Sequence, residues 1–157
     1  MEKLSILFVC LGNICRSPAA EAIFIKQIIK QGIADKFIVD SAGTGSWHIG
    51  KKADSRMMAA AQNRGIFIKS EARQIKKSDF EKFNYIVTMD NANFNNVLKF
   101  KKANSLGDFA NIVKIQKFAK IFNESEVPDP YFGGADGFNY VLDILEDSVS
   151  EFLKNIK

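Results

Sequence analysis

The stretch LSILFVCLGNICRSPAAEA, residues 4–22, joins a strand pattern directly to a helix pattern. Residues 4–9 are almost continuously apolar, which is typical of a strand buried on both faces of a parallel sheet. Ser17 followed by Pro18 predicts a helix start, with the serine hydroxyl as N-cap and the proline at the first helical position. Between the two elements lies a short loop with Cys10 at its first position and Arg16 at its last. The sequence therefore predicts a strand, a compact loop and a helix in immediate succession.

This loop has the properties of a phosphate-binding site. Backbone N–H groups between a strand and a helix can turn inward around an anion, and the helix N-terminus adds roughly half a positive charge. Gly12 and Asn13 are residue types that take a positive φ readily, as a tight loop requires. Arg16 offers a planar fork of donors to two phosphate oxygens. The residues expected to bind phosphate are Leu11, Gly12, Asn13, Ile14, Cys15, Arg16 and Ser17.

Cys10 is expected to lie beneath the phosphorus as a thiolate. A free cysteine titrates near ~8.5, so only a few per cent is ionised at pH 7. Helix N-termini and neighbouring arginines lower cysteine pKa values to about 3.5–7.5. A hydrogen bond from Ser17 would help the sulfur as nucleophile and later as leaving group. The loop is therefore expected to accept a phosphoryl group on Cys10.

The run VCLGNICRSP, residues 9–18, resembles the signature of the low-molecular-weight protein tyrosine phosphatases. The second cysteine and the Ser-Pro pair make this match more specific than a cysteine, five residues and an arginine. The resemblance extends over nearly the whole chain. It implies a single-domain α/β fold: a four-stranded, parallel, twisted sheet with helices on both faces and the phosphate-binding loop between the first strand and the first helix. It also implies hydrolysis of phosphotyrosine or small aryl phosphates through a phosphocysteine on Cys10, without metal or cofactor, releasing inorganic phosphate.

Length and composition agree with a soluble globular protein of one domain, residues 1–157. The formal charge of +4 favours anionic substrates, and without a Lys/Arg tract it gives little support to nucleic-acid binding. No run approaches the ~18 apolar residues of a membrane span, and the first residues enter the strand without a signal peptide. Two cysteines separated by four residues are not a secreted disulfide framework. A cytoplasmic protein is expected, and the family norm implies a monomer.

Strand and helix patterns alternate along the rest of the chain. Further strands are expected at 37–41, 85–89 and 112–115, and helices at 18–31, 54–64, 78–81, 91–102 and 137–155. Loops are expected at 41–53 and 116–136, and residues 66–77 fit no single pattern. The alternation predicts a parallel sheet covered on both faces. Because sites form at the carboxyl ends of such strands, Cys10, Ser41, Asp90 and the loop after Ile115 are expected to converge.

Asp129 is the candidate proton donor. Departure of an alkoxide or phenoxide from phosphorus needs an acid, which typically contributes ~10²–10⁴ in rate. Asp129 stands in Val-Pro-Asp-Pro-Tyr, residues 127–131, a proline-flanked loop in which Asp-Pro alone would indicate only a turn. The Asp-Pro-Tyr run matches the general-acid loop of the family. The resemblance therefore implies that Asp129 protonates the leaving group and then activates water.

The resemblance also assigns supporting residues. In the family, the asparagine that matches Asn13 is held in a strained conformation by hydrogen bonds, including one from the serine that matches Ser41. Ser17, beside Cys10, completes the expected loop support. Leu11, Trp47 and Tyr131 match the walls of a deep aromatic slot, which would admit an aryl phosphate and leave a short phosphoserine out of reach.

Cys15 has two interpretations. It is either a buried small hydrophobe, the commoner fate of a free cysteine, or a partner for Cys10 in a disulfide that protects the nucleophile from over-oxidation. The resemblance favours the disulfide as a reversible switch. Asp90 also has two interpretations: it either orients an arginine or caps the N-terminus of a helix. Ser70 occupies a position at which several relatives carry a histidine that supports the loop.

Other chemistries are less well supported. His48 is the only histidine, and no motif pairs it with a cysteine. Cys10 and Cys15 are badly spaced for zinc and lack other soft ligands. A thioredoxin-coupled arsenate reductase has a similar fold and loop but needs further cysteines, and none follows Cys15. A phosphoprotein-binding module with a dead site is the alternative from another class, although all the catalytic residue types are present.

Overall fold

The apolar run near the start of the chain becomes β1 (Leu4–Cys10), an interior strand of a parallel sheet. Ile6 and Phe8 point into one hydrophobic cluster, whereas Leu7 and Val9 point into another on the opposite face. All four side chains are fully buried, which agrees with the alternation of side chains along a strand. β1 is therefore covered on both faces, as its nearly continuous apolar sequence predicts.

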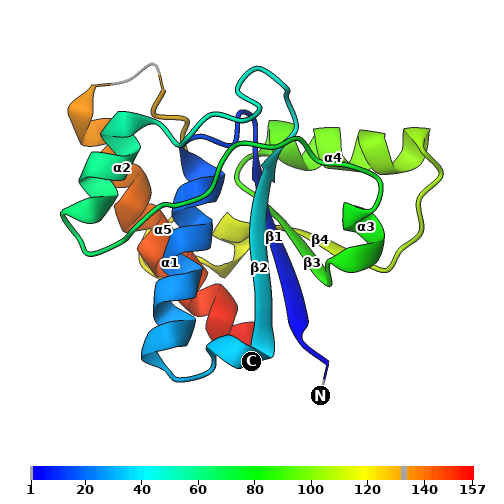
Figure 1. Ribbon diagram of the computed structural model, residues 1–157, viewed down its shortest axis with the longest axis horizontal. Helices are drawn as coiled ribbons and strands as arrows, with labels where there is room; N and C mark the ends of the chain where they lie inside the picture. Colours follow the sequence, from blue (N-terminus) through cyan, green and yellow to red (C-terminus); the bar gives the residue numbers. More distant parts are fainter. Residues whose placement is uncertain (1, 132–133) are drawn as a thin grey trace.

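The computed structural model describes residues 2–131 and 134–157 (Figure 1). Within these residues, four strands form one parallel sheet in the order β2-β1-β3-β4. The other strands are β2 (Phe37–Gly43), β3 (Tyr85–Thr88) and β4 (Asn111–Lys114). The helices are α1 (Arg16–Lys30), α2 (Ser55–Gln62), α3 (Asp79–Lys82), α4 (Asn91–Ala103) and α5 (Ala135–Ile156), with 3-10 turns η1 (Ala34–Lys36) and η2 (Ile115–Phe118). The expected single-domain α/β fold is confirmed.

Helices cover both faces of the sheet (Figure 1). Helices α1, α2 and α5 lie on one side, and α3 and α4 lie on the other. The larger core is rich in phenylalanine: the ring centroid of Phe8 is 5.8 Å from that of Phe24 and 6.3 Å from that of Phe152. These tilted and edge-to-face contacts are the arrangements that aromatic pairs prefer. Since Phe24 belongs to α1 and Phe152 to α5, they also join the first helix to the last.

Several element boundaries differ from the sequence prediction. Strand β2 continues to Gly43, and α5 begins at Ala135, two residues before the expected start. The ambiguous segment 66–77 forms no long element and pairs through isolated bridges, Gly43 with Gln74 and Lys52 with Glu71. Of the loop expected at 116–136, residues 132–133 lie outside the described part of the chain. In the part described, no helix is long and apolar enough to cross a membrane.

Candidate active site

Cys10 ends β1, and Arg16 begins α1, so the loop between them occupies the carboxyl end of the central strand. The Cys10 residue is buried, and its Sγ lies 3.0 Å from Ser17 Oγ. The backbone N–H of Asn13 donates to the same sulfur over 3.3 Å. Hydrogen bonds to a charged sulfur favour the thiolate over the thiol. The surroundings of Cys10 therefore suit a nucleophile.

Neighbouring segments hold the loop backbone in its curved shape. Thr44 N–H donates to the Cys10 carbonyl and Gly45 N–H to the Leu11 carbonyl, both over 2.9 Å. Asp54 N–H donates to the Ile14 carbonyl over 2.8 Å. Because these carbonyls face outward to their donors, the loop can present N–H groups to an anion on its concave side.

The helix start differs from the sequence prediction. Cys15 occupies the N-cap position, Arg16 is the first helical residue, and no side chain in the described part of the chain caps the helix. The Ser17 hydroxyl is not an N-cap because it accepts from the Asn13 amide and contacts Cys10. An uncapped N-terminus keeps its backbone donors available for an anion.

Asn13 has φ +57°, in the left-handed region, whereas Gly12 is not in that region. The expectation of positive φ thus holds for Asn13 and is wrong for Gly12. A Cβ on Gly12 would lie 3.0 Å from His48 Cδ2, so glycine lets the His48 ring pack closely against the loop.

The Asn13 side chain joins three segments of the molecule. Its Nδ2 donates to Ser17 Oγ over 2.8 Å and to Ser41 Oγ over 3.0 Å. Its Oδ1 accepts from the Arg73 backbone N–H over 3.0 Å. The bond between Asn13 and Ser41 therefore runs opposite to the direction expected from the family, because the Ser41 hydroxyl donates to Glu21 Oε1 over 2.6 Å.

Arg16 is buried and forms ion pairs with two carboxylates. Its Nη1 lies 2.6 Å from Asp90 Oδ2 and donates to the Val127 carbonyl over 3.0 Å, and its Nη2 lies 3.5 Å from Asp129 Oδ2. Burial lowers the pKa of Arg16, but Cys10 and Asp90 outweigh it and raise the pKa above its ordinary value. Asp90 has both expected roles, because its Oδ1 also caps α4 by accepting from Asn93 N–H.

A small pocket of about 90 Å³ brings the predicted catalytic and slot residues together. Asp129 is fixed there by a bond from Tyr131 N–H to its Oδ1, over 3.0 Å. Leu11, Trp47 and Tyr131 are partly exposed at the rim, with Trp47 the most open. The pocket is lined by Cys10, Leu11, Gly12, Ile14, Cys15, Arg16, Trp47, Asp129 and Tyr131. Asn13, Ser17 and Ser41 lie behind it as the hydrogen-bonded support already described.

Cys15 differs from Cys10 in its electrostatic surroundings. Burial is the main cause of a strongly raised pKa at Cys15, and the charges of Asp54 and Cys10 raise it further. Cys15 is therefore a thiol near neutral pH. Both cysteines are free and buried in this structure.

Sequence reasoning gave no role to three further residues at the site. The His48 ring lies 6.0 Å from that of Tyr131. Arg56 donates to Asp54 and to the Tyr131 carbonyl, tying α2 to the loop that carries Asp129. Glu21 binds Ser41. The sequence could have indicated Glu21: it follows Ser17 by four residues, so the two side chains lie on the same face of α1.

Comparisons with known proteins agree with this geometry. Residues 5–157 match the family described as low molecular weight phosphotyrosine protein phosphatase. The chain is 40% identical to the protein of that name from Schizosaccharomyces pombe, over 99% of this chain and 98% of the relative. It is 33% identical to the one from Sus scrofa, over 98% and 96%.

Solved structures give the same result. A protein tyrosine phosphatase from Entamoeba histolytica superposes with a TM-score of 0.91 at 43% identity, covering 98% of this chain and 97% of that one. A Drosophila arginine phosphatase superposes with a TM-score of 0.91 at 32% identity, covering 97% of each chain. The chain described here belongs to the low molecular weight phosphotyrosine protein phosphatase family.

Proposed function

We propose that the protein hydrolyses phosphotyrosine in proteins, or small aryl phosphates, through a phosphocysteine on Cys10. The observation that carries this proposal is that Cys10, Arg16 and Asp129 line one small pocket. At about 90 Å³ the pocket is far below the ~300–1,000 Å³ typical of sites for larger ligands, so it suits the phosphoryl group alone. The attached ring would lie among Leu11, Trp47 and Tyr131.

Phosphate binding uses donors that the loop already directs toward the pocket. Arg16 Nη1 is held by Asp90 and Val127, whereas Nη2 makes, among the described residues, only the longer contact with Asp129. A phosphate oxygen can replace that longer contact and gain a charge-assisted hydrogen bond. The uncapped start of α1 and the loop N–H groups then surround the remaining oxygens.

In the first step the Cys10 thiolate attacks phosphorus and the bond to the aryl oxygen breaks. Asp129, in its protonated form, gives its proton to the departing oxygen. Arg16 and the loop N–H groups stabilise the charge on the three equatorial oxygens. The products are a phenol and a phosphocysteine.

In the second step the Asp129 carboxylate takes a proton from water as the water oxygen attacks phosphorus. The sulfur–phosphorus bond breaks, the sulfur leaves as a thiolate, and inorganic phosphate forms. Ser17, 3.0 Å from the sulfur, is placed to donate to the leaving thiolate. Asp129 is protonated again and ready for the next cycle.

Phosphate release from matched peptides carrying phosphotyrosine, phosphoserine or phosphoarginine tests the proposal. Phosphoarginine is included because a structural neighbour is an arginine phosphatase. With dithiothreitol and EDTA present, we expect turnover of phosphotyrosine, none with Cys10→Ser, and a loss of ~10²–10⁴ with Asp129→Asn. Asp136→Asn, which changes an exposed carboxylate at the start of α5, is the matched control. Binding of phosphopeptide without turnover would make the protein a binding module, and faster turnover of phosphoarginine would change the assigned substrate.

We further propose that the enzyme is a cytoplasmic monomer regulated by a reversible Cys10–Cys15 disulfide. Two free cysteines at the site suit a reducing compartment, which the Cys10 mechanism needs. Sedimentation of the purified protein and localisation of a fluorescent fusion test the first two statements. Peroxide treatment followed by thiol reduction tests the third.

A further inference from the structure

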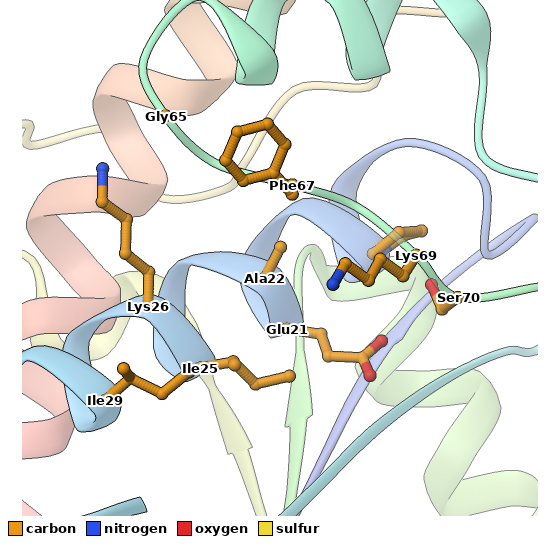
Figure 2. A pocket seen from close by; sticks show the side chains of 10 residues that line it. Glu21, Ala22, Ile25, Lys26, Ile29, Gly65, Phe67, Lys69 and Ser70 are labelled. Carbon is orange, nitrogen blue, oxygen red and sulfur yellow. The ribbon is translucent and has the colours of Figure 1, made fainter.

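A second pocket lies behind the phosphate loop, between α1 and the segment 65–70 (Figure 2). It encloses about 270 Å³, several times the volume of the active-site pocket, and shares no lining residue with it. Figure 2 shows the Phe67 ring above Ala22, with Ile25 and Ile29 along the helix below. The interior is thus mostly apolar. Its volume is slightly below the ~300 Å³ at which ligand pockets begin, so it suits a small, fragment-sized ligand.

Glu21 is the one carboxylate among the residues that line this pocket, beside Lys26, Lys69 and Ser70, and it extends toward Ser70 in Figure 2. One oxygen accepts from Ser41 over 2.6 Å, and the Ser70 side chain lines the same pocket. A carboxylate has about four acceptor positions, so the hydrogen bond from Ser41 leaves Glu21 able to accept more. Burial raises the pKa of Glu21 to about 7, with a further rise from Asp40, whereas Ser41, Ser70 and Arg73 lower it.

Two of the cations near Glu21, Arg73 and Lys26, have other partners. Arg73 pairs with Asp79 and Asp40, and the Lys26 ammonium donates to the Arg64 carbonyl. Lys69 is exposed at the pocket edge. Among residues 2–131 and 134–157, Glu21 takes part in no ion pair. A partly buried carboxylate beside an apolar cavity is complementary to a cation with N–H donors and an apolar body.

We propose that this pocket binds a small amphipathic cation, an apolar ring or short chain carrying an amine or amidine, with the charged group on Glu21 and the apolar part against Ala22 and Phe67. The bound cation acts on the catalytic loop through a continuous hydrogen-bond chain. Glu21 accepts from Ser41, Ser41 accepts from Asn13, and Asn13 donates to Ser17 beside the nucleophile. A cation that holds Glu21 ionised strengthens the first of these bonds.

Benzamidine is the probe, because its amidinium presents two parallel N–H donors to a carboxylate and its ring matches the apolar wall. Titration into the 15N-labelled full chain is expected to shift the amides of Ala22, Phe67 and Ser70, with a dissociation constant on the order of 1 mM for so small a ligand. The Asn13 side-chain amide should move with the same midpoint. Benzyl alcohol and benzoate, which keep the ring and lack the cation, should bind about tenfold more weakly or not at all.

Three variants and a change of pH test which groups bind benzamidine. Glu21→Gln should weaken binding about tenfold, as should lowering the pH from 7.5 to 5.5, which protonates Glu21. Phe67→Ser changes a largely exposed ring and should weaken binding without unfolding the protein. Lys69→Ala should strengthen it, since a nearby positive charge is removed. Absence of saturable shifts, shifts centred on Trp47 instead, or equal binding of benzyl alcohol would each overturn the proposal.

Discussion

Replacing Asn13 by alanine removes the side chain that joins the phosphate loop to three other segments. The amide contacts Ser17 on α1, Ser41 on β2 and the backbone of Arg73, and each bond lies between 2.8 and 3.0 Å. Asn13 is almost fully buried and has φ +57°. Alanine therefore loses three buried hydrogen bonds and must also adopt a backbone conformation that it disfavours.

The expected cost follows from these contacts. A buried hydrogen bond contributes about 0.5–1.5 kcal/mol net, and the left-handed conformation costs a residue with a Cβ about 1 kcal/mol. With about 1 kcal/mol for each of the three hydrogen bonds and about 1 kcal/mol for the backbone, Asn13→Ala lowers the free energy of unfolding by about 4 kcal/mol. If the loop alone absorbs this cost, the population with a correctly formed site falls about 10³-fold, and kcat/KM falls with it.

Urea unfolding and phosphate release from a phosphotyrosine peptide measure the two quantities. Asn13→Gly is the matched control, because glycine accepts the positive φ but makes none of the side-chain hydrogen bonds. We expect glycine to recover about 1 kcal/mol, or about fivefold in kcat/KM, relative to alanine. Wild-type kcat/KM in Asn13→Ala, or full recovery in Asn13→Gly, would refute the assignment of the loop conformation to these hydrogen bonds.

Three other predictions concern single residues. The pKa of Glu21 is raised from 4.5 to about 7, so between pH 4.5 and 7 the native state holds a proton that the unfolded state has released. The free energy of unfolding of wild type should therefore fall, relative to that of Glu21→Gln, as the pH rises through this range. The same pH dependence in both proteins, measured by urea unfolding, would contradict this. Iodoacetamide should modify Cys10 and spare Cys15, whose raised pKa keeps it protonated, and mass spectrometry locates the label. In separate, unalkylated samples, peroxide followed by thiol tests whether Cys15→Ser recovers less activity than wild type. Gly43→Ala should lower kcat/KM at least about tenfold, because its Cβ would lie 2.7 Å from a loop carbonyl; Gly107→Ala, which meets nothing within 4 Å, should have no effect.

The phosphate loop could be predicted because its strand, loop and helix are contiguous in sequence. The alternating core of β1 and the parallel sheet follow from local patterns of the same kind. Ser17 shows the limit of such patterns. Serine before proline favours an N-cap, but the hydroxyl also lies within reach of Cys10 and Asn13, and only the folded loop decides between these partners.

The remaining features depend on distant contacts. Arg56 donates to the Tyr131 carbonyl, and Glu21 accepts from Ser41. Each pair is far apart in the sequence, so no local spacing indicates it. Residues 66–77 show no clear periodicity in the sequence because they form no long helix or strand: isolated bridges and backbone hydrogen bonds to residues 43–52 hold them in place. Asp90 had two interpretations in the sequence, and its two carboxylate oxygens satisfy both at once.

The position of Arg16 relative to its partners has a consequence for how activity is acquired during synthesis and refolding. Arg16 is separated from Asp90 by 74 residues and from Asp129 by 113. The nucleophile is thus synthesised early, whereas its acid and the helix α5 that packs on α1 come last. Closing such long loops slows folding. A nascent or truncated chain carries the cysteine without the means to turn over phosphate, and enzymatic activity should return in the slowest refolding phase, after most of the helical signal.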